Sequence, residues 1–318
     1  MSKIRRGVTQ LGGILITLLG ASILIFGALY LAPGDPLTVI VGGPEKLTPE
    51  NIAYATAQYH LDQPFLVRYV LWLGDVVTGD LGRSFVYNVP VLDLLASRIG
   101  TTLSLTAYAG LFMLAIALPL GVWSGRRRGR ADQLTLVGTT LAASIPSFVA
   151  GIVLVALFGV ALRWFPVSGA GEGFIDGIYH LTLPAIALAI GALAVLTRVT
   201  RQSTIEASAR DHVEVARMRG LPEGYILTRH IFRNAVPPVV TMVGVILASM
   251  LAGTVVVETV FGLSGIGSLL IDAIDTSDLP VTQAVLMLMV IAYIVATLLT
   301  EVVNRIADPR LRERTSRS

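Results

Sequence analysis

Six long apolar stretches limit the folds open to this chain more than any other feature of its sequence. A helix that crosses a membrane needs about 20 consecutive, mostly apolar residues, and inside hydrocarbon its backbone must satisfy its own hydrogen bonds. Each stretch therefore predicts one transmembrane helix. The six stretches are Val8–Leu31, Thr101–Trp123, Leu134–Leu162, Leu181–Leu196, Val236–Val260 and Val281–Val303.

The composition agrees with a membrane protein. Of the 318 residues, 54% are hydrophobic and 14% are charged, whereas a soluble domain has about 25% charged residues. The chain has no cysteine, which excludes disulfide bonds and thiolate metal sites. We therefore predict an all-α, polytopic membrane protein with six transmembrane helices.

The first apolar stretch follows a basic N-terminus and could be read as a cleaved signal peptide. It runs from Val8 to Leu31, which is longer than the apolar region of a signal peptide, about 7–15 residues. The "APGDP" that follows has no clear cleavage site with small residues. We therefore expect a retained first transmembrane helix.

Arginine and lysine are distributed unevenly among the segments that connect the spans. The two terminal segments and the connections at 126–130 and 198–233 carry 19 of the 24 basic residues. The opposite connections carry 13 of the 21 acidic residues. Because cytoplasmic segments are enriched in arginine and lysine, we expect both termini and the 198–233 connection to lie in the cytoplasm.

This topology divides the chain into five parts. They are a cytoplasmic N-terminus with the first span (1–32), an external insertion (33–100), a five-helix core (101–306) with a cytoplasmic loop (199–235), and a cytoplasmic tail (307–318). In the insertion, "LTPENIAYATAQYHL" predicts a helix with Thr48 as its cap and Pro49 at its first position. The insertion is expected to be a small helical unit.

The cytoplasmic loop carries clear helix signals. The run 211–219 favours a helix, and Gly220 follows it, where glycine adopts the left-handed conformation easily. Leu221 occupies the hydrophobic position of a Schellman motif. Pro222 then suits the first turn of a second helix, which is expected to end before Pro237.

Three interpretations of this helix–turn–helix are open. Its arginines could contact lipid headgroups. It could read DNA, but both of its ends are tied to transmembrane helices, which disfavours a nucleic-acid partner. Docking against a soluble partner best explains a short, capped helix with Val213, Ala216 and Gly220 on one face.

The chain resembles the membrane subunits of ABC importers. Glu214-Val215-Ala216, followed after three residues by Gly220, is similar to the EAA motif of that family, with Val215 in place of its first alanine. The segments "APGDP", "HLDQPFLVRYVLWLGDVVTGDLGRSF", "SIPSF" and "ETVFGLSGIGSLLIDAIDTSDLPVTQAV" look like those of the dipeptide, oligopeptide and nickel branch. The long insertion after the first span resembles the first of the two permeases in such systems.

The resemblance implies a type I ABC importer permease fold in the cytoplasmic (inner) membrane of a bacterium or archaeon. A second homologous permease would complete the translocation path, two cytoplasmic ATPase subunits would hydrolyse ATP, and an extracytoplasmic binding protein would deliver peptides. The loop would be the coupling helix that docks on an ATPase. Its implied contact residues are Val213, Glu214, Ala216, Arg217, Gly220 and Leu221.

The chain itself is expected to be non-catalytic and to hold no cofactor or metal. Its two lysines, Lys3 and Lys46, lie outside any glycine-rich phosphate loop, so ATP and Mg²⁺ would be bound by the partner subunits. No H-E-x-x-H zinc motif is present. The "GLSG" at 262–265 resembles an intramembrane protease motif, but no histidine that could serve as its base follows it.

Two further residues are candidates for a role in transport. Pro146 is expected to kink the third helix, either as a packing feature or as a bend that lines the path. Glu258 is expected to cap a helix near the external surface or to act at an external gate. Because the spans are otherwise nearly free of ionisable residues, an ion-coupled transporter is less favoured. Import of nickel or another small solute, and a structural subunit, stay open.

Overall fold

A computed structural model describes residues 2–31, 45, 47–59, 62–127 and 129–307. Those residues are almost entirely helical, and their one strand-like contact is an isolated antiparallel bridge between Arg83 and Pro90. Two π-helical segments, η2 (Val155–Ala161) and η3 (Leu227–Ile231), continue α-helices. The α-helices are α1 (Ser2–Leu31), α3 (Pro49–Tyr59), α4 (Phe65–Thr78), α5 (Val91–Arg126), α6 (Arg130–Ser144), α7 (Ser147–Leu154), α8 (Gly173–Ser208), α9 (Asp211–Met218), α10 (Glu223–Ile226), α11 (Phe232–Val260), α12 (Ile266–Asp275) and α13 (Leu279–Ala307).

The helices group into two compact units. The first consists mainly of residues 3–102 and 263–294, and the second mainly of residues 103–262 and 295–318. Helices α5 and α13 therefore each contribute to both units.

In the first unit, α4 packs on α1 through aromatic side chains. The centroid of the Phe26 ring lies 5.5 Å from that of Phe65 and 5.3 Å from that of Trp72. The Ser22 and Tyr69 hydroxyl oxygens are 2.7 Å apart. Offset and tilted rings at such distances add to the energy of apolar burial, so α4 is a packed element and not a linker.

Polar contacts in the first unit join segments that lie far apart in the sequence. Asp278, which directly precedes α13, is fully buried. Its carboxylate accepts hydrogen bonds from the Ser84 hydroxyl and, at 3.3 Å, from the Val86 backbone. The Thr102 hydroxyl accepts one at 2.8 Å from the backbone of Ile266. Residues 263–294 thus complete a unit that the N-terminal third of the chain begins.

The predicted insertion is helical where the structure describes it, as expected. The backbone of Asn51 donates to the Thr48 hydroxyl at 3.2 Å, and α3 begins at Pro49, so the predicted cap is confirmed. Helix α5, however, begins at Val91, and residues 91–100 are its first turns. The sequence placed the boundary at Thr101 because only from there is the stretch uniformly apolar.

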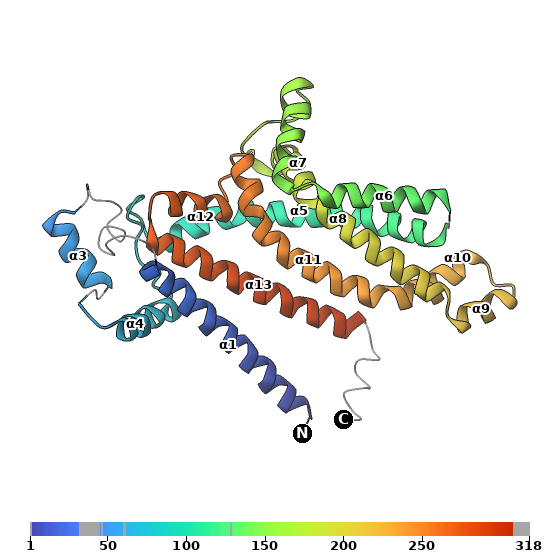
Figure 1. Ribbon diagram of the computed structural model, residues 1–318, viewed down its shortest axis with the longest axis horizontal. Helices are drawn as coiled ribbons and strands as arrows, with labels where there is room; N and C mark the ends of the chain where they lie inside the picture. The colour runs from blue at the N-terminus through green and yellow to red at the C-terminus, as the bar shows by residue number, and fades with distance from the viewer. Residues whose placement is uncertain (1, 32–44, 46, 60–61, 128, 308–318) are drawn as a thin grey trace. The chain divides into compact units, whose positions relative to one another are not determined.

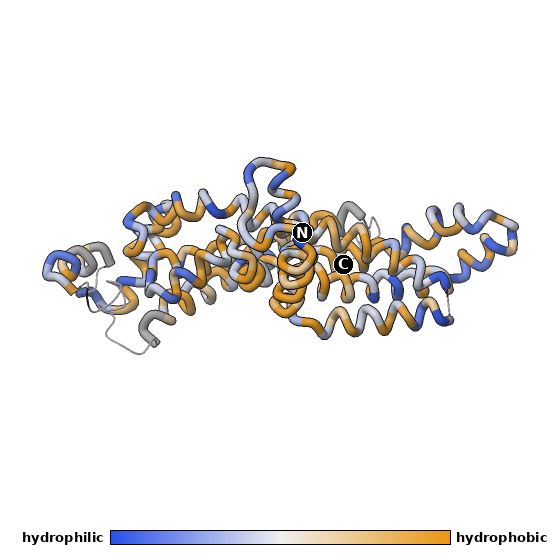
Figure 2. The backbone as a smooth tube through the Cα atoms, turned by 90° about the horizontal axis from the view of Figure 1, so that it is seen from above, coloured by the Kyte–Doolittle hydropathy of each residue, from blue (hydrophilic) through white to orange (hydrophobic). Residues whose placement is uncertain are grey.

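In the second unit, α8 contacts α6, α7 and α11 (Figure 1). Small residues allow close approach: a Cβ atom on Gly121 of α5 would lie 2.6 Å from the Cβ atom of Thr200 in α8. A Cβ atom on Gly244 of α11 would overlap the side chain of Thr300 in α13. Small residues at helix contacts are typical of membrane bundles. Figure 2 shows long, largely hydrophobic helices and several hydrophilic stretches, among them α9 and α10.

Five helices are long and apolar enough to cross a membrane, or six if the bent pair formed by α6 and the α7–η2 segment counts as one span. This agrees with the six predicted spans. The fourth span was predicted as Leu181–Leu196, whereas α8 runs from Gly173 to Ser208 with Pro184 inside it. The first and last turns of α8 contain polar residues, so the apolar stretch in the sequence is shorter than the helix.

Pro146 does more than kink the third span. Helix α6 ends at Ser144, α7 begins at Ser147, and their axes are bent by 94°. The residue before a proline is disfavoured in the helical conformation, and Ile145 is extended, with φ −91° and ψ 116°. The expectation of one kinked helix over Leu134–Leu162 was therefore wrong, because the helix is broken.

Pro237 does not end the second helix of the loop, contrary to the prediction. Pro222 is the cap of α10 and not its first residue, and the helical path runs from Glu223 to Val260 through η3 and both prolines. Proline in a packed transmembrane helix is tolerated because neighbouring groups can satisfy the carbonyls it leaves free. The predicted second helix of the cytoplasmic loop is thus continuous with the helix of the fifth predicted span.

Candidate functional site

The candidate site is the hairpin formed by α9, the turn at 219–222 and α10. It connects the end of α8 to the start of α11 (Figure 1). Two residues, Ala209 and Arg210, separate α8 from α9. The short connections restrict the orientations that α9 can adopt.

The turn after α9 has the predicted Schellman geometry. The Gly220 backbone is left-handed, with φ +72°. The Gly220 amide donates to the Arg217 carbonyl at 2.9 Å, and the Leu221 amide donates to the Ala216 carbonyl at 3.3 Å. These are the two hydrogen bonds that define the motif. Glycine takes this conformation at the lowest steric cost, which accounts for Gly220.

One face of α9 packs inside the chain. Val213 is 0% exposed and Ala216 is 3% exposed. They belong to a buried cluster, which we call the hairpin core. Its members are Ala207, Val213, Ala216, Ile226, Ile231 and Ala235. The core joins α9 to the ends of α8 and α11, so a displacement of α9 must move those helices or break the core.

The opposite face of α9 is exposed. Glu214, Arg217, Gly220 and Leu221 lie on the surface. The structure therefore separates the six predicted contact residues into four at the surface and two, Val213 and Ala216, in the hairpin core. The small apolar face that was read as a contact surface for a partner is the internal anchor.

Sequence reasoning missed two exposed apolar residues on α9. Val215 is 40% exposed and Met218 is 74% exposed. They are three residues apart and therefore on one side of the helix. This spacing is the signal in the sequence, whereas comparison with the EAA motif marks Val215 only as a substitution. With Leu221, at 37% exposure, they form what we call the α9 patch.

Charged residues link the hairpin to its surroundings. The Glu223 carboxylate lies 2.9 Å from Arg217 Nε and 3.7 Å from a guanidinium nitrogen of Arg126, in the last turn of α5. Exposed ion pairs contribute little stability, with a median of about 0–1 kcal/mol. Here they orient the start of α10 between α9 and α5.

This arrangement is suited to docking. Among the described residues, no group of three or more His, Asp or Glu side chains could hold a metal ion. The α9 patch combines protruding apolar side chains with charges on a rigid support, which is the usual anatomy of a protein contact.

The two other candidate residues lie in α11 and between α6 and α7. Glu258 is in the last turn of α11 and is 0% exposed, so it is enclosed within the packed unit; a gate role for it stays a prediction. Pro146 is exposed and marks the break between α6 and α7.

Two family models together match almost the whole chain. Residues 117–313 match the model described as "Binding-protein-dependent transport system inner membrane component". Residues 4–106 match the model described as the N-terminal part of a binding-protein-dependent transport system membrane component.

Curated relatives are similar over almost their full length. A probable peptide ABC transporter permease of Sinorhizobium fredii is 35% identical over 91% of this chain and 93% of its own. An oligopeptide transport system permease of Bacillus subtilis is 34% identical over 92% and 95%. The glutathione transport system permease of Salmonella choleraesuis is 37% identical over 95% and 97%.

A solved structure shows the same fold. A chain of the methionine ABC transporter MetNI, in an inward-facing conformation, aligns with a TM-score of 0.57 at 19% identity. The alignment covers 68% of this chain and 96% of the other.

Proposed function

We propose that this chain, which belongs to the family of binding-protein-dependent transport system inner membrane components, is a permease subunit of an ATP-driven importer of peptides. It pairs with a second, homologous permease to enclose the translocation path. An extracytoplasmic binding protein delivers the peptide. The relatives named above for peptides, oligopeptides and glutathione support this substrate class over nickel.

The energy comes from partner ATPases, which bind ATP and Mg²⁺. The observation that carries this proposal is the two-sided construction of α9, with Val213 and Ala216 in the hairpin core and Val215 and Met218 exposed on its other side. An ATPase that binds the α9 patch transmits its motion through the hairpin core to α8 and α11. Packed elements switch between discrete arrangements instead of deforming smoothly, so a rigid hairpin suits this role.

The orientation follows from charge. The connections at 126–130 and 198–233, the second of which contains the hairpin, carry 11 of the 17 arginines of the second unit, and such segments face the cytoplasm. Both termini are then cytoplasmic, and the chain is a multi-pass protein of the inner membrane.

Uptake by the complete complex in proteoliposomes tests the function. A labelled dipeptide or oligopeptide should accumulate only with the binding protein outside and ATP with the ATPases. Accumulation driven by a proton or sodium gradient without ATP would identify a secondary transporter instead. Parallel assays with nickel and with tripeptides define the substrate class.

Crosslinking tests the docking surface. Met218→Cys should form a disulfide with cysteines placed along the ATPase groove in membranes. Ala216→Cys is the matched control, because a side chain that is 3% exposed cannot reach a partner. Equal crosslinking at both positions, or none at Met218, would rule out docking through the α9 patch.

A further inference from the structure

The second unit contains a groove that the transport mechanism above does not use. It has a volume of about 500 Å³ and lies between α5, α6 and α8. We call it the α6 groove. Its lining residues are Leu120, Trp123, Ala131, Leu134, Thr135, Gly138, Thr139, Ala142 and Leu193. Cavities of about 300–1,000 Å³ are the size range in which proteins hold small molecules.

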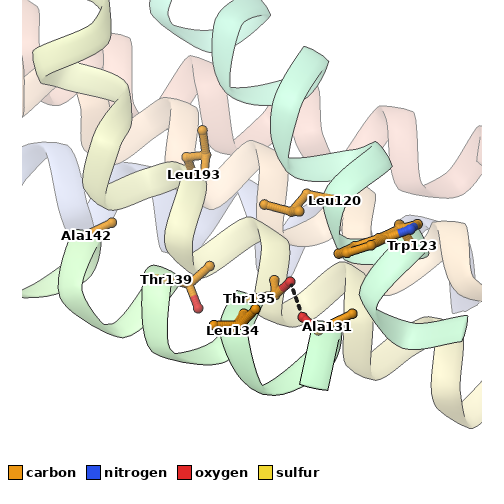
Figure 3. Close-up of a pocket in the computed structure, with 9 residues that line it drawn as sticks. Leu120, Trp123, Ala131, Leu134, Thr135, Thr139, Ala142 and Leu193 are labelled. Carbon is orange, nitrogen blue, oxygen red and sulfur yellow. Dashed lines mark hydrogen bonds between the residues drawn. The ribbon is translucent and has the colours of Figure 1, made fainter. Parts of the chain in front are cut away.

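The walls of the groove favour an apolar occupant. Most of the lining is leucine, alanine and tryptophan, and the polar exceptions are already engaged. The Thr135 hydroxyl donates to the Ala131 carbonyl at 3.0 Å (Figure 3), and the Thr139 hydroxyl donates to the Leu136 carbonyl at 3.1 Å. Both threonines therefore have their hydroxyl protons committed within α6.

The groove is elongated and one of its ends is basic. Figure 3 places Trp123 and Ala131 at one end and Ala142 and Leu193 towards the other. Arg127 lies one turn beyond Trp123, and its amide donates to the Trp123 carbonyl at 3.0 Å. Arg130 directly precedes Ala131. Positive charge is thus concentrated at the end of the groove that lies next to the C-terminus of α5.

Several of these cations have no carboxylate partner. Among the described residues, no Asp or Glu carboxylate forms a salt bridge with the exposed Arg127 or Arg130. Arg198 of α8 donates to the Thr140 hydroxyl at 2.7 Å and to Thr139 at 3.4 Å, and both of these partners are neutral. Arg201, in contrast, is neutralised by Asp132, with a guanidinium nitrogen 2.6 Å from its carboxylate.

We propose that the α6 groove binds one anionic phospholipid, with an acyl chain along the apolar wall and the phosphate beside Arg127 and Arg130. Basic pockets between transmembrane helices on the cytoplasmic side suit anionic headgroups. Trp123 lies in the last turn of α5, next to the basic residues, and tryptophan is enriched at membrane interfaces. The groove suits both parts of the ligand, since a free phosphate leaves the apolar wall uncovered and a zwitterionic lipid places its own cation beside the arginines.

Lipid retention by the complete transporter complex tests this site. The complex is reconstituted in nanodiscs that hold equal amounts of phosphatidylglycerol and phosphatidylethanolamine. It is then extracted into detergent, and bound lipid is counted by native mass spectrometry. The wild-type complex should retain one phosphatidylglycerol per copy of this chain in preference to phosphatidylethanolamine.

Two variants separate the halves of the site. Gly138→Leu fills the groove, because nothing lies within 4 Å of a Cβ atom added there. Arg127→Gln with Arg130→Gln removes the charge. Each should lower retained phosphatidylglycerol on the order of tenfold. The matched control is Arg229→Gln with Arg233→Gln, two exposed arginines outside the groove, which should leave retention unchanged.

Specific results would overturn the proposal. Retention that is unchanged in Gly138→Leu, or equal for both lipids, would exclude an anionic lipid in the groove. Displacement by inorganic phosphate would identify a phosphate site, and absence of any bound lipid from the wild-type complex would show that another subunit covers the groove. Transport is measured on the same samples, so this proposal can fail while ATP-dependent peptide uptake persists.

Discussion

The α9–α10 hairpin and the α6 groove both place apolar residues beside arginines, yet they differ in how the apolar residues are covered. In the hairpin, the chain covers its own apolar face, and Val213 and Ala216 are buried in the hairpin core. In the groove, the apolar wall is left open over about 500 Å³. A filled core supports a rigid, protruding surface that suits a protein partner, whereas an unfilled groove suits a ligand that enters it.

Placing a charge in the filled core should have the largest effect. Val213→Asp buries a carboxylate with no partner, which should cost about 3 kcal/mol or more of stability. We expect the hairpin to detach and peptide-stimulated ATP hydrolysis to be lost. Hydrogen exchange over residues 207–235 would detect the detachment. The matched control is Val215→Asp on the exposed face, which should keep the exchange protection; equal loss in both would contradict an internal anchor.

Substitutions at two glycines compare the open α6 groove with the closely packed contact between α11 and α13. Gly244→Ala forces a methyl group into Thr300, and such overpacking typically costs about 1–3 kcal/mol. Gly138→Ala meets open space and replaces a poor helix former, which should stabilise the unit by up to about 1 kcal/mol. Thermal unfolding of the purified protein measures both. Equal destabilisation would mean that the groove is closed.

The turn should respond less strongly than the hairpin core. Gly220→Val places a β-branched residue at φ +72°, which should cost about 1–2 kcal/mol. The protein should still insert, while coupling between peptide and ATP hydrolysis falls. Gly224→Ala is the control, because Gly224 lies in α10 with free space around it. Normal coupling in Gly220→Val would show that the turn geometry is dispensable.

The smallest effect is expected for the ion pairs of the hairpin. Glu223→Gln removes the partner of Arg217 and Arg126, but exposed pairs contribute less than about 1 kcal/mol. Stability should change little, and any loss of coupling should diminish at high salt, since screening already weakens the pair in the wild type. A stability loss as large as that of Val213→Asp would mean that the pairs, and not the core, hold the hairpin.

The sequence was a reliable guide wherever one local property decided the structure. Apolar stretches located the spans, because hydrocarbon requires long apolar helices. The Thr48 cap of α3 and the Schellman turn at Gly220 were also predicted correctly. Each depends on side chains and backbone angles within one or two helical turns, and such short-range preferences can be read from residue types.

The prolines show where local reading fails. Pro146 breaks a helix and Pro237 does not, although both follow an apolar residue. Ser144, Ile145 and Pro146 are all exposed, and the Ile145 amide donates to the Ala142 carbonyl at 3.3 Å, so α6 closes its last turn before the proline. The path through Pro237 begins in the hairpin core and continues in packing against α8. The outcome depends on neighbours from distant parts of the chain.

What the sequence by itself determined is therefore the class of the protein, its helical spans and the turn that ends α9. The tertiary structure alone decided which face of α9 is buried, because Val213 and Val215 are equally apolar and differ only in what packs against them. It also decided that an apolar wall between α5, α6 and α8 stays uncovered. Burial is a property of contacts between separate helices, and a single sequence records residue types but not those contacts.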